Sequence, residues 1–487
     1  MKFTMSDLLK EDIWRNFYKL SQIPRPSGCM QEVADFIEDF GKNLGLETLR
    51  DKANNIIIRK PATLGYENCK TIILQSHMDM VPQKNEGTVH DFTKDPISLL
   101  IQENWLTADG TTLGADNGIG VAAILSVLEQ KSLPHGNIEA LFTVDEENGM
   151  NGAFALADDV LKGDILLNLD SEDEHELIVG CCGAVKVECN FPFVKESVPV
   201  GDKAFKIAVV GLQGGHSGID IHLQLANANK LLFHFLKTLV CDFEARLAFV
   251  EGGDVVNAIP RESFAVITIP KGGEDDLFDV TQEFLEIYKT EYSTLEPTLN
   301  LTVEPTEIPD GLFPEFVQDD LINAVVAVPN GVYRYMPNLK DSVETSSNLG
   351  IIKTMETNVT LEFLVRSVLE SMKGEVRSMI ESAFSLAGAK INVFGNYEGW
   401  MPESCSEILS LAQEKYVSVF GRESLTKTIH AGLECGIIGS KYPCLDMISF
   451  GPTIKYPHSP NERVDIGSVE RFWEFLKIVL ASAPQKK

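Results

Sequence analysis

Polar side chains gather in three clusters within one short stretch of the chain, residues 71–149. The clusters are Ser76-His77-Met78-Asp79-Met80, Gly114-Ala115-Asp116-Asn117-Gly118 and Asp145-Glu146-Glu147-Asn148-Gly149. Residues 71–75 and 140–144 are apolar runs typical of buried strands, and residues 119–128 are apolar at helical spacing. Loops line the crevice outside the carboxyl ends of the strands in an open α/β sheet, and ligands bind there. We therefore expect a functional site at this edge of a sheet.

Two imidazoles and three carboxylates form a candidate set of metal ligands: His77, Asp116, Glu147, Asp170 and His458. Each is predicted on a loop that follows a strand or precedes a helix. Zinc binds imidazole and carboxylate ligands, and a carboxylate shared between two ions holds them close enough to act on one reacting group. A single loop histidine is more often solvated or a capping group, so the prediction depends on the whole set. It favours two Zn²⁺, for which Co²⁺ or Mn²⁺ could substitute on the same ligands.

Two carboxylates beside this set suggest supporting roles. Glu146 and Glu147 are adjacent, and on an extended segment they would point in opposite directions, so one could bind metal while the other acts as a general base. Asp79 follows His77 by two residues and could accept the second N–H of the imidazole. The alternative for Asp79 is a turn residue at the end of a strand.

Two further residues lie outside these clusters. His216, in the flexible segment Gly214-Gly215-His216-Ser217-Gly218, could donate a hydrogen bond to a developing oxyanion. Arg366 follows the apolar run 360–365 and could bind a carboxylate through two parallel hydrogen bonds. A surface charge at a strand end is the alternative for Arg366.

Composition excludes several classes of protein. The chain has 487 residues, 44% of them hydrophobic. This is longer than the chain length at which a single hydrophobic core stops growing, so two or more domains are expected. The balance of 42 Lys+Arg against 71 Asp+Glu gives a net charge of -29, which disfavours binding to nucleic acid or to an anionic membrane. No apolar run reaches the roughly 18 residues that span a bilayer, and the start lacks a signal-peptide core. The nine cysteines are odd in number and include the adjacent Cys181 and Cys182, which predicts reduced thiols and a cytoplasmic protein.

The order of predicted elements indicates one domain inserted into another. An α/β alternation continues to about Ala184 and returns after Tyr397. Residues 205–292 and 298–394 between them form two similar units of strands and helices, and the repeat superposes Asn257 on Asn348. We therefore predict an α/β catalytic domain (residues 1–186 and 399–487) with a central mixed sheet flanked by helices. An inserted α+β lid domain (residues 187–398), built from two similar units, interrupts it.

Six motifs together resemble the dizinc exopeptidase family, which includes carnosinases, tripeptidase and glutamate carboxypeptidase, and most of all its bacterial aminoacyl-histidine (Xaa-His, non-specific) dipeptidase branch. The resemblance covers nearly the whole chain. The motifs are Ser76-His77-Met78-Asp79, Gly114-Ala115-Asp116-Asn117-Gly118, Asp145-Glu146-Glu147, Asn168-Leu169-Asp170-Ser171-Glu172, Gly215-His216-Ser217-Gly218 and Pro457-His458-Ser459-Pro460-Asn461-Glu462.

This resemblance implies a fold, an activity and residue roles. The implied activity is hydrolysis of Xaa-His and other dipeptides by a metal-activated water, with Glu146 as general base. His216 would stabilise the oxyanion, and Arg366 would bind the C-terminal carboxylate of the substrate. The implied metal ligands are His77 and Asp170 on one zinc, Glu147 and His458 on the other, and Asp116 between them, with Asp79 supporting His77.

The enlarged lid suggests how the site is completed. Family members with a small lid take the oxyanion histidine and an asparagine from a partner subunit. Because the inserted region here is duplicated, we expect Asn348 or Asn257 to complete the site within one chain, although a homodimer could still form. Glu434 or Asp173 could bind the free amine of a dipeptide, or either could be solvated.

Two other functions fit parts of the pattern. An N-acyl amino-acid deacylase of the same family would have the same metal ligands. A binding protein that has lost its metals would keep the fold, but the complete ligand set and the intact Glu146 argue against it.

Overall fold

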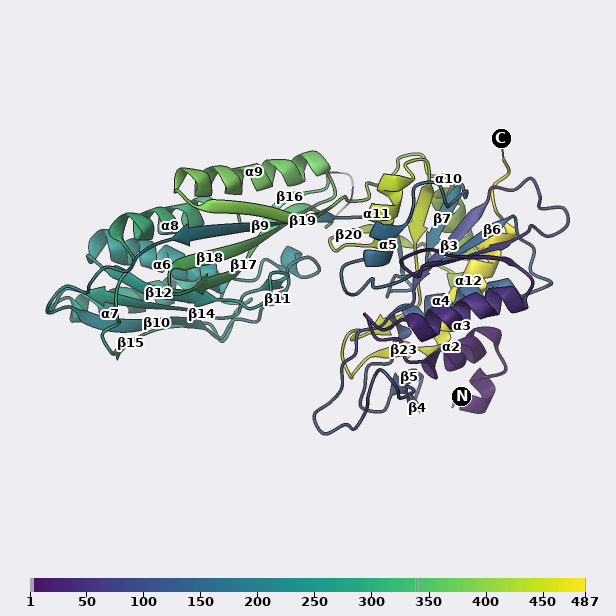
Figure 1. The fold of residues 1–487 in the computed structure, drawn as a ribbon, viewed down its shortest axis with the longest axis horizontal. Helices are drawn as coiled ribbons and strands as arrows, with labels where there is room; N and C mark the ends of the chain where they lie inside the picture. The colour runs from purple at the N-terminus through teal and green to yellow at the C-terminus, as the bar shows by residue number, and fades with distance from the viewer. Residues whose placement is uncertain (1–3, 338, 340, 487) are drawn as a thin grey trace. The chain divides into compact units, whose positions relative to one another are not determined.

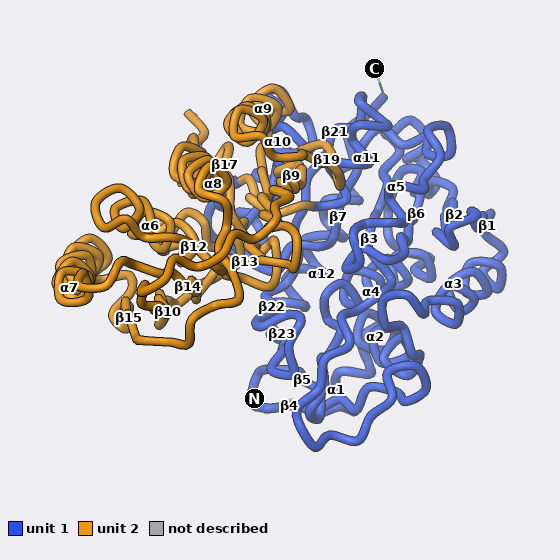
Figure 2. Tube along the Cα trace, turned by 60° about the vertical axis from the view of Figure 1, so that its left-hand side comes forward, with its two compact units in different colours: residues 1–180, 400–427, 433–487 blue, residues 181–399, 428–432 orange. Residues whose placement is uncertain are grey.

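The computed structural model describes residues 4–337, 339 and 341–486, and these form two compact units (Figure 2). The first contains the residues up to Gly180, Trp400–Lys427 and the residues from Leu433 on; the second contains Cys181–Gly399 and Thr428–Gly432. The boundary predicted at residues 186–187 falls inside strand β9 (Gly183–Pro192), which belongs entirely to the second unit.

The first unit is built on a mixed eight-stranded sheet, as the α/β prediction requires. The order is β1 (Glu47–Arg50), β2 (Ile56–Lys60), β6 (Ile138–Thr143), β3 (Ile72–His77), β7 (Ile165–Asn168), β21 (Asp446–Ser449), β8 (Glu176–Cys181) and β20 (Leu425–Ile429), of which the last two residues of β20 belong to the second unit. The pairs β3–β6, β3–β7 and β7–β21 are parallel, while β1–β2, β2–β6 and β21–β8 are antiparallel.

The three central strands bring the predicted polar clusters to one edge. Every residue of β3, β6 and β7 is buried, as expected for parallel strands covered on both faces. His77 pairs with Thr143, and Gln75 pairs with Asn168. The loops that follow these strands therefore start side by side.

Helices cover this sheet. Helix α4 (Ala115–Glu129) packs against β3 on one side and α2 (Asp12–Ser21) on the other, so nearly all of its residues are buried (Figure 1). A short helix, α1 (Met5–Leu8), precedes α2. The other helices of this unit are α3 (Gln31–Asn43), α5 (Asn151–Ala155), α10 (Glu407–Phe420), α11 (Glu434–Lys441) and α12 (Ile466–Ala481).

A small antiparallel sheet, which the sequence pattern did not predict, supports the loop that carries His458. Its order is β22 (Ile454–Lys455), β23 (Arg463–Asp465), β5 (Trp105–Ala108) and β4 (Leu99–Gln102). The hairpin between β22 and β23 contains His458, whose φ of 59° lies in the left-handed region. The backbone therefore turns sharply at this residue.

The second unit contains a nine-stranded antiparallel sheet. Helices α6, α8 and α9 pack side by side on one face of it (Figure 1). The strand order is β15 (Asn300–Thr306), β10 (Lys203–Val210), β14 (Ser263–Ile269), β12 (Arg246–Gly252), β17 (Val343–Thr354), β18 (Asn358–Ser367), β9 and β19 (Lys390–Tyr397), and β16 (Gly331–Tyr335) also pairs with β17. The helices are α6 (Ala228–Asp242), α7 (Glu274–Glu291), α8 (Glu315–Ala327) and α9 (Glu370–Leu386).

This sheet corrects the predicted composition of the repeat. Residues 298–303 were expected to open the second half, but β15 pairs with β10 in the first half. The corresponding place beside β18 is taken by β9, which precedes the whole first half in the chain. The linear order of elements could not reveal this, because pairing joins strands that are far apart in sequence.

Two of the shorter elements form a separate ribbon in the second unit. Strand β11 (Gly215–His216) pairs antiparallel with β13 (Ala258–Ile259).

Among the helices of the described residues, none is long and apolar enough to cross a membrane.

Candidate metal centre

The predicted metal ligands converge at the carboxyl edge of the central sheet. His77 ends β3, Asp116 lies in the first turn of α4, and His458 lies in the β22–β23 hairpin; Glu147 and Asp170 follow β6 and β7. Their ligand atoms form overlapping groups in which all atoms lie within 4.8 Å of one another. The groups are His77, Asp116 and Asp170; Asp116, Glu147 and His458; and His77, Glu146 and Glu147.

Asp116 lies between the two histidines. Its Oδ1 is 3.2 Å from Nε2 of His77, and its Oδ2 is 3.1 Å from Nε2 of His458. On either side, Asp170 Oδ1 is 3.3 Å from His77 Nε2, and Glu147 Oε1 is 2.9 Å from His458 Nε2. One carboxylate thus presents one oxygen to each half of the cluster, which is the arrangement that a ligand shared by two cations requires.

Asp79 holds two parts of the cluster at once. Its carboxylate lies 3.5 Å from His77 Nδ1, and its carbonyl oxygen lies 3.2 Å from the same atom. The carboxylate also accepts hydrogen bonds from the backbone N–H groups of Glu146 and Glu147, at 3.0 and 3.3 Å. Contacts at Nδ1 orient the imidazole so that Nε2 faces the other ligands.

The orientation predicted for Glu146 and Glu147 is wrong. The two side chains were expected to point in opposite directions, but both approach His77. The segment is not extended here, because the chain turns at Asp145, where φ is 51°. Glu146 therefore lies inside the cluster, next to the predicted ligands.

Crowding of carboxylates in a buried site shifts their ionisation. Burial raises the pKa of Glu146 well above its usual value, and the charges of Asp170 and Glu147 add to the rise while His77 opposes it. Burial would lower the pKa of His458, but its contacts with Asp116 and Glu147 raise it to about 11. Without a cation, protons must therefore neutralise part of this cluster.

This donor set fits divalent cations. Oxygen and imidazole nitrogen donors surround a common point, and the repulsion among the carboxylates would be relieved by positive charge there.

Arg25 is a functional residue that the sequence analysis missed. It is 2% exposed, and its guanidinium donates hydrogen bonds to the carbonyl oxygens of Met78 (3.0 Å) and Asp79 (3.2 Å) and to that of Gly114. Burial lowers the pKa of Arg25 to about 10, against the opposing effect of nearby carboxylates, so it remains charged at neutral pH. Arg25 joins the loops that carry His77 and Asp116; the one sequence signal was its position between two prolines, Pro24 and Pro26.

Glu462 joins the Asp116 segment to the hairpin that carries His458. Its carboxylate, 2% exposed, accepts four backbone hydrogen bonds of 2.8–3.2 Å from the consecutive residues Leu113, Gly114, Ala115 and Asp116. Negative charge is stabilised at a helix N-terminus, where N–H groups lack partners within the helix. Glu462 therefore fixes the His458 hairpin to the segment that carries Asp116. The sequence motif contained this residue, but nothing in the pattern gave it a role.

Two predicted amine-binding residues have other contacts. Glu434 is the first residue of α11 and fully buried; it accepts 2.6 Å hydrogen bonds from Gln75 Nε2 and Thr143 Oγ1. The alternative that Glu434 is solvated is thus wrong. Asp173 accepts the backbone N–H of His175 at 2.9 Å, which closes a local turn.

The four remaining candidates, His216, Asn257, Asn348 and Arg366, lie in the second unit. His216 is partly exposed on β11, and Asn257 is exposed just before β13. Asn348 is 1% exposed in β17, so the two asparagines that the sequence could not separate have opposite environments. Arg366 is 5% exposed in β18, opposite Ser346.

A mixed sheet flanked by helices, with a cluster of carboxylates and imidazoles at the carboxyl edge of its strands, is the architecture of a metal-dependent hydrolase. The chain belongs to the peptidase family M20/M25/M40, whose family model matches residues 73–482. Peptidases of this family depend on metal ions, in agreement with the donor set.

Individual relatives agree with this assignment. The chain is 44% identical over 482 residues to the cytosol non-specific dipeptidase of Escherichia coli, covering 99% of each chain. Its structure resembles that of aminoacylhistidine dipeptidase from Vibrio alginolyticus with a TM-score of 0.91 and 43% identity, over 100% of this chain and 99% of the other. Aminopeptidase PepT from Bacillus cereus shares the fold, with a TM-score of 0.58 and 16% identity over 98% and 99% of the two chains.

The contacts of Glu462 predict a specific defect in metal binding. In Glu462→Gln, one oxygen becomes an NH₂ group that faces backbone donors, so the segment carrying Asp116 loses its anchor. We expect metal affinity to fall about 10–100-fold and stability of the metal-free protein to fall by roughly 1–3 kcal/mol. Isothermal titration of the metal-free protein and thermal melting measure the two effects.

Glu474→Gln is the matched control, because Glu474 is exposed and contacts Lys477 on the surface of α12. Equal metal affinity in Glu462→Gln and Glu474→Gln would show that Glu462 does not support the ligands.

The raised pKa values of His77 and His458 predict that metal binding releases protons. Carboxylate contacts raise the pKa of both imidazoles in the metal-free protein, that of His458 to about 11, and only neutral imidazole binds a metal. Metal affinity should therefore rise as pH rises from 6 to 8 (about 10-fold per pH unit for each proton released). Titrations in buffers of different ionisation enthalpy count the protons, and the absence of any release would contradict the assignment of these histidines as ligands.

Proposed function

We propose that the chain is a dipeptidase that uses two Zn²⁺, or Co²⁺ or Mn²⁺ in their place, to hydrolyse Xaa-His and other dipeptides. The position of Asp116 between His77 and His458, beside the half-buried Glu146, is the observation that carries this proposal. His77 and Asp170 would hold one ion, Glu147 and His458 the other, and Asp116 both. The ions would lower the pKa of a water molecule and polarise the peptide carbonyl.

Glu146 is the proposed general base. Its carboxylate lies within the ligand cluster, and burial raises its pKa, so it can take a proton and hold it near neutral pH. The same carboxyl group can then give that proton to the leaving amine. Asp79 assists by holding the backbone of Glu146 through a 3.0 Å hydrogen bond.

His216 is the proposed oxyanion donor, and its own contacts favour the required tautomer. Nδ1 accepts hydrogen bonds from the backbone N–H groups of Gly218 (3.3 Å) and Ile219 (3.0 Å). In the neutral ring the proton is therefore on Nε2, which can donate to a developing negative charge.

Arg366 is the proposed group for the C-terminal carboxylate of the substrate. Its Nε is buried without a hydrogen-bond partner among the described residues. A buried arginine whose Nε–H lacks a partner is suited to a carboxylate, which the guanidinium can bind through two parallel hydrogen bonds. The neighbouring His430 adds no competing positive charge, because burial together with Arg366 lowers its pKa to about 3.

Of the two asparagines, we propose Asn257 for contact with substrate, since Asn257 is exposed and Asn348 is buried. We place no substrate contact on Glu434 or Asp173. By similarity to a relative named for the cytosol, we also propose a cytoplasmic location. A homodimer is compatible with this function and is not required by it.

Replacement of the general base should separate chemistry from metal binding. Glu146→Gln keeps the size of the side chain but cannot take a proton, so kcat for an Xaa-His dipeptide should fall about 10²–10⁴-fold with metal content unchanged. Release of histidine from the dipeptide and of amino acid from an N-acetyl amino acid are measured in parallel, with and without a chelator. Glu474→Gln again serves as the control.

Three outcomes would contradict the proposed function. If Glu146→Gln were as active as the parent, Glu146 would not be the general base. If the protein kept full activity after complete removal of metal, the ions would not take part in the reaction. Preferential cleavage of N-acetyl amino acids would favour the deacylase.

The proposal that one chain supplies every catalytic group predicts the result of a mixing experiment. A mixture of Glu146→Gln and His216→Ala chains should stay as inactive as either variant, since each chain lacks one necessary group. Co-expression followed by a dipeptidase assay, with the mixed species verified by different affinity tags, tests this. Recovery of activity would show that His216 acts in the partner subunit.

A further inference from the structure

Both polar atoms of the Asn348 side chain form hydrogen bonds inside the second unit. Its Nδ2 donates to the carbonyl oxygens of Val256 (3.1 Å) and Ala258 (2.8 Å), and its Oδ1 accepts a hydrogen bond of 3.2 Å from Asn227 Nδ2. At 1% exposure the amide has no surface left for a substrate. The two contacts of Nδ2 connect β17 with the backbone on both sides of Asn257.

The segment that Asn348 holds is the support of His216. We call β11 and β13, with Ser217 and Asn257 at their ends, the β11–β13 ribbon. His216 pairs with Ala258 in this ribbon, and the backbone N–H of Ser217 donates to the carbonyl oxygen of Asn257 at 2.8 Å. The carbonyl groups that Asn348 binds therefore lie directly opposite the histidine and beside the exposed asparagine.

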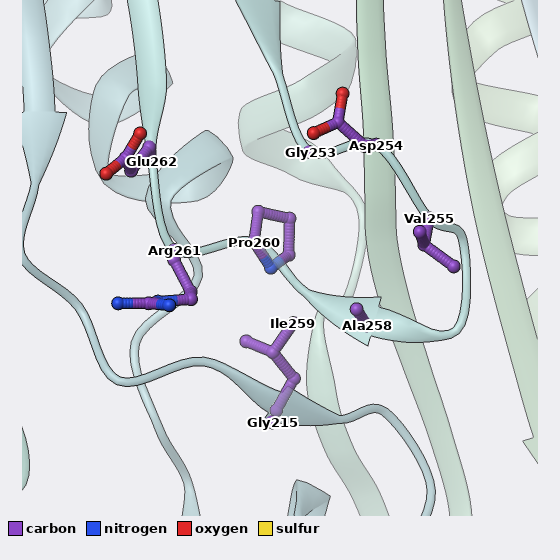
Figure 3. A pocket seen from close by; sticks show the side chains of 9 residues that line it. All are labelled: Gly215, Gly253, Asp254, Val255, Ala258, Ile259, Pro260, Arg261 and Glu262. Atoms are coloured by element: carbon purple, nitrogen blue, oxygen red, sulfur yellow. The ribbon is translucent and has the colours of Figure 1, made fainter. Parts of the chain in front are cut away.

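Packing alone does not fix this ribbon. A cavity of about 400 Å³ borders it, lined by Gly215 of β11, by both residues of β13, and by the loop Gly253–Val255 (Figure 3). Figure 3 shows Gly215 and β13 side by side, with the loop arching away from them. Because one side of the ribbon faces a cavity, directional hydrogen bonds must set its position.

The other side of the ribbon approaches β17 very closely. A side chain at Gly350 would place its Cβ 2.6 Å from the carbonyl oxygen of Val256, and one at Gly253 would place it 1.9 Å from that of Gly350. Glycine at these positions lets the backbones meet. The amide of Asn348 can thus reach, from within β17, one carbonyl group of the ribbon and one in the residue just before it.

A second asparagine extends the connection to a helix. Asn227 caps the N-terminus of α6 by accepting the backbone N–H of Lys230 at 3.2 Å, and it donates to Asn348 and to the carbonyl oxygen of Leu349. The path from α6 through Asn227 and Asn348 to the ribbon consists of buried, paired amides. Such networks hold one geometry, because each unmade hydrogen bond in them is costly.

We propose that Asn348 is a positioning residue for catalysis, which fixes the β11–β13 ribbon so that His216 reaches the oxyanion and Asn257 the substrate. This inference rests on the proposed oxyanion role of His216. It assigns the two asparagines different tasks: Asn257 contacts the substrate, and Asn348 acts through the ribbon.

A double-mutant cycle tests whether Asn348 acts through His216. His216→Ala should lower kcat about 10²–10³-fold, and Asn348→Ala about 10–100-fold, since a small displacement of a catalytic group is costly. The double variant should stay within about twofold of His216→Ala, because the residue that Asn348 positions is then absent. Asn348→Asp, which keeps the shape but loses the donor, should be at least as impaired as Asn348→Ala.

Gln318→Ala is the matched control. Gln318 is also a 1% exposed amide of the second unit, and it accepts the backbone N–H of Leu247 at 2.6 Å, away from the ribbon. It should lose stability without loss of kcat. Hydrogen exchange of peptides covering residues 213–219 and 253–259 should become faster in Asn348→Ala and remain unchanged in Gln318→Ala.

The outcomes separate this inference from the proposed function. Full activity of His216→Ala would overturn the oxyanion role, while the exchange measurement would still decide whether Asn348 fixes the ribbon. With His216→Ala impaired, unchanged kcat in Asn348→Ala would overturn the positioning role. An equal further loss of kcat in the His216→Ala background would overturn it as well, since the effect would then not pass through His216.

Discussion

Mutual repulsion of carboxylates in a buried site is the constraint on which the first unit depends. Asp116, Glu146, Glu147 and Asp170 approach one another around His77 more closely than free carboxylates would. The segments that carry them are held by other contacts: the guanidinium of Arg25 donates to the carbonyl oxygens of Met78 and Gly114, and a backbone N–H at the start of α4 donates to Glu462. A bound cation would neutralise the negative charge of these carboxylates, which the side chains of the protein do not fully neutralise.

Much of this site follows from sequence because it depends on strand ends. Apolar runs locate β3, β6 and β7 well, and parallel neighbours put His77, the Glu146–Glu147 pair and Asp170 at one edge. The α/β class with a mixed sheet is likewise confirmed. The orientation of Glu146 was not predicted, because it depends on the left-handed φ of Asp145, which no residue pattern indicates.

The supporting residues escaped for a different reason. Arg25 and Glu462 form hydrogen bonds with backbone groups of distant segments. Every residue type has a backbone carbonyl, and nearly every one has an N–H, so the sequence does not show which of these groups will be bound. Pairing of β9 with β18 is hidden in the same way, because the strand that completes the second half of the sheet precedes the first half in the chain. Sequence patterns thus reveal side-chain ligands better than the contacts that position them.

The same division of roles holds in the second unit. His216 and Arg366 were proposed from residue type, since an imidazole beside glycines and an arginine after an apolar strand suggest chemistry by themselves. Asn257 and Asn348 are identical in type and similarly placed in the predicted repeat, so only burial separates them. An exposed amide on a ribbon can meet a ligand, whereas an amide with all its polar atoms paired can only fix what it touches. In both units, the groups suited to chemistry are therefore held by buried residues whose partners are backbone atoms.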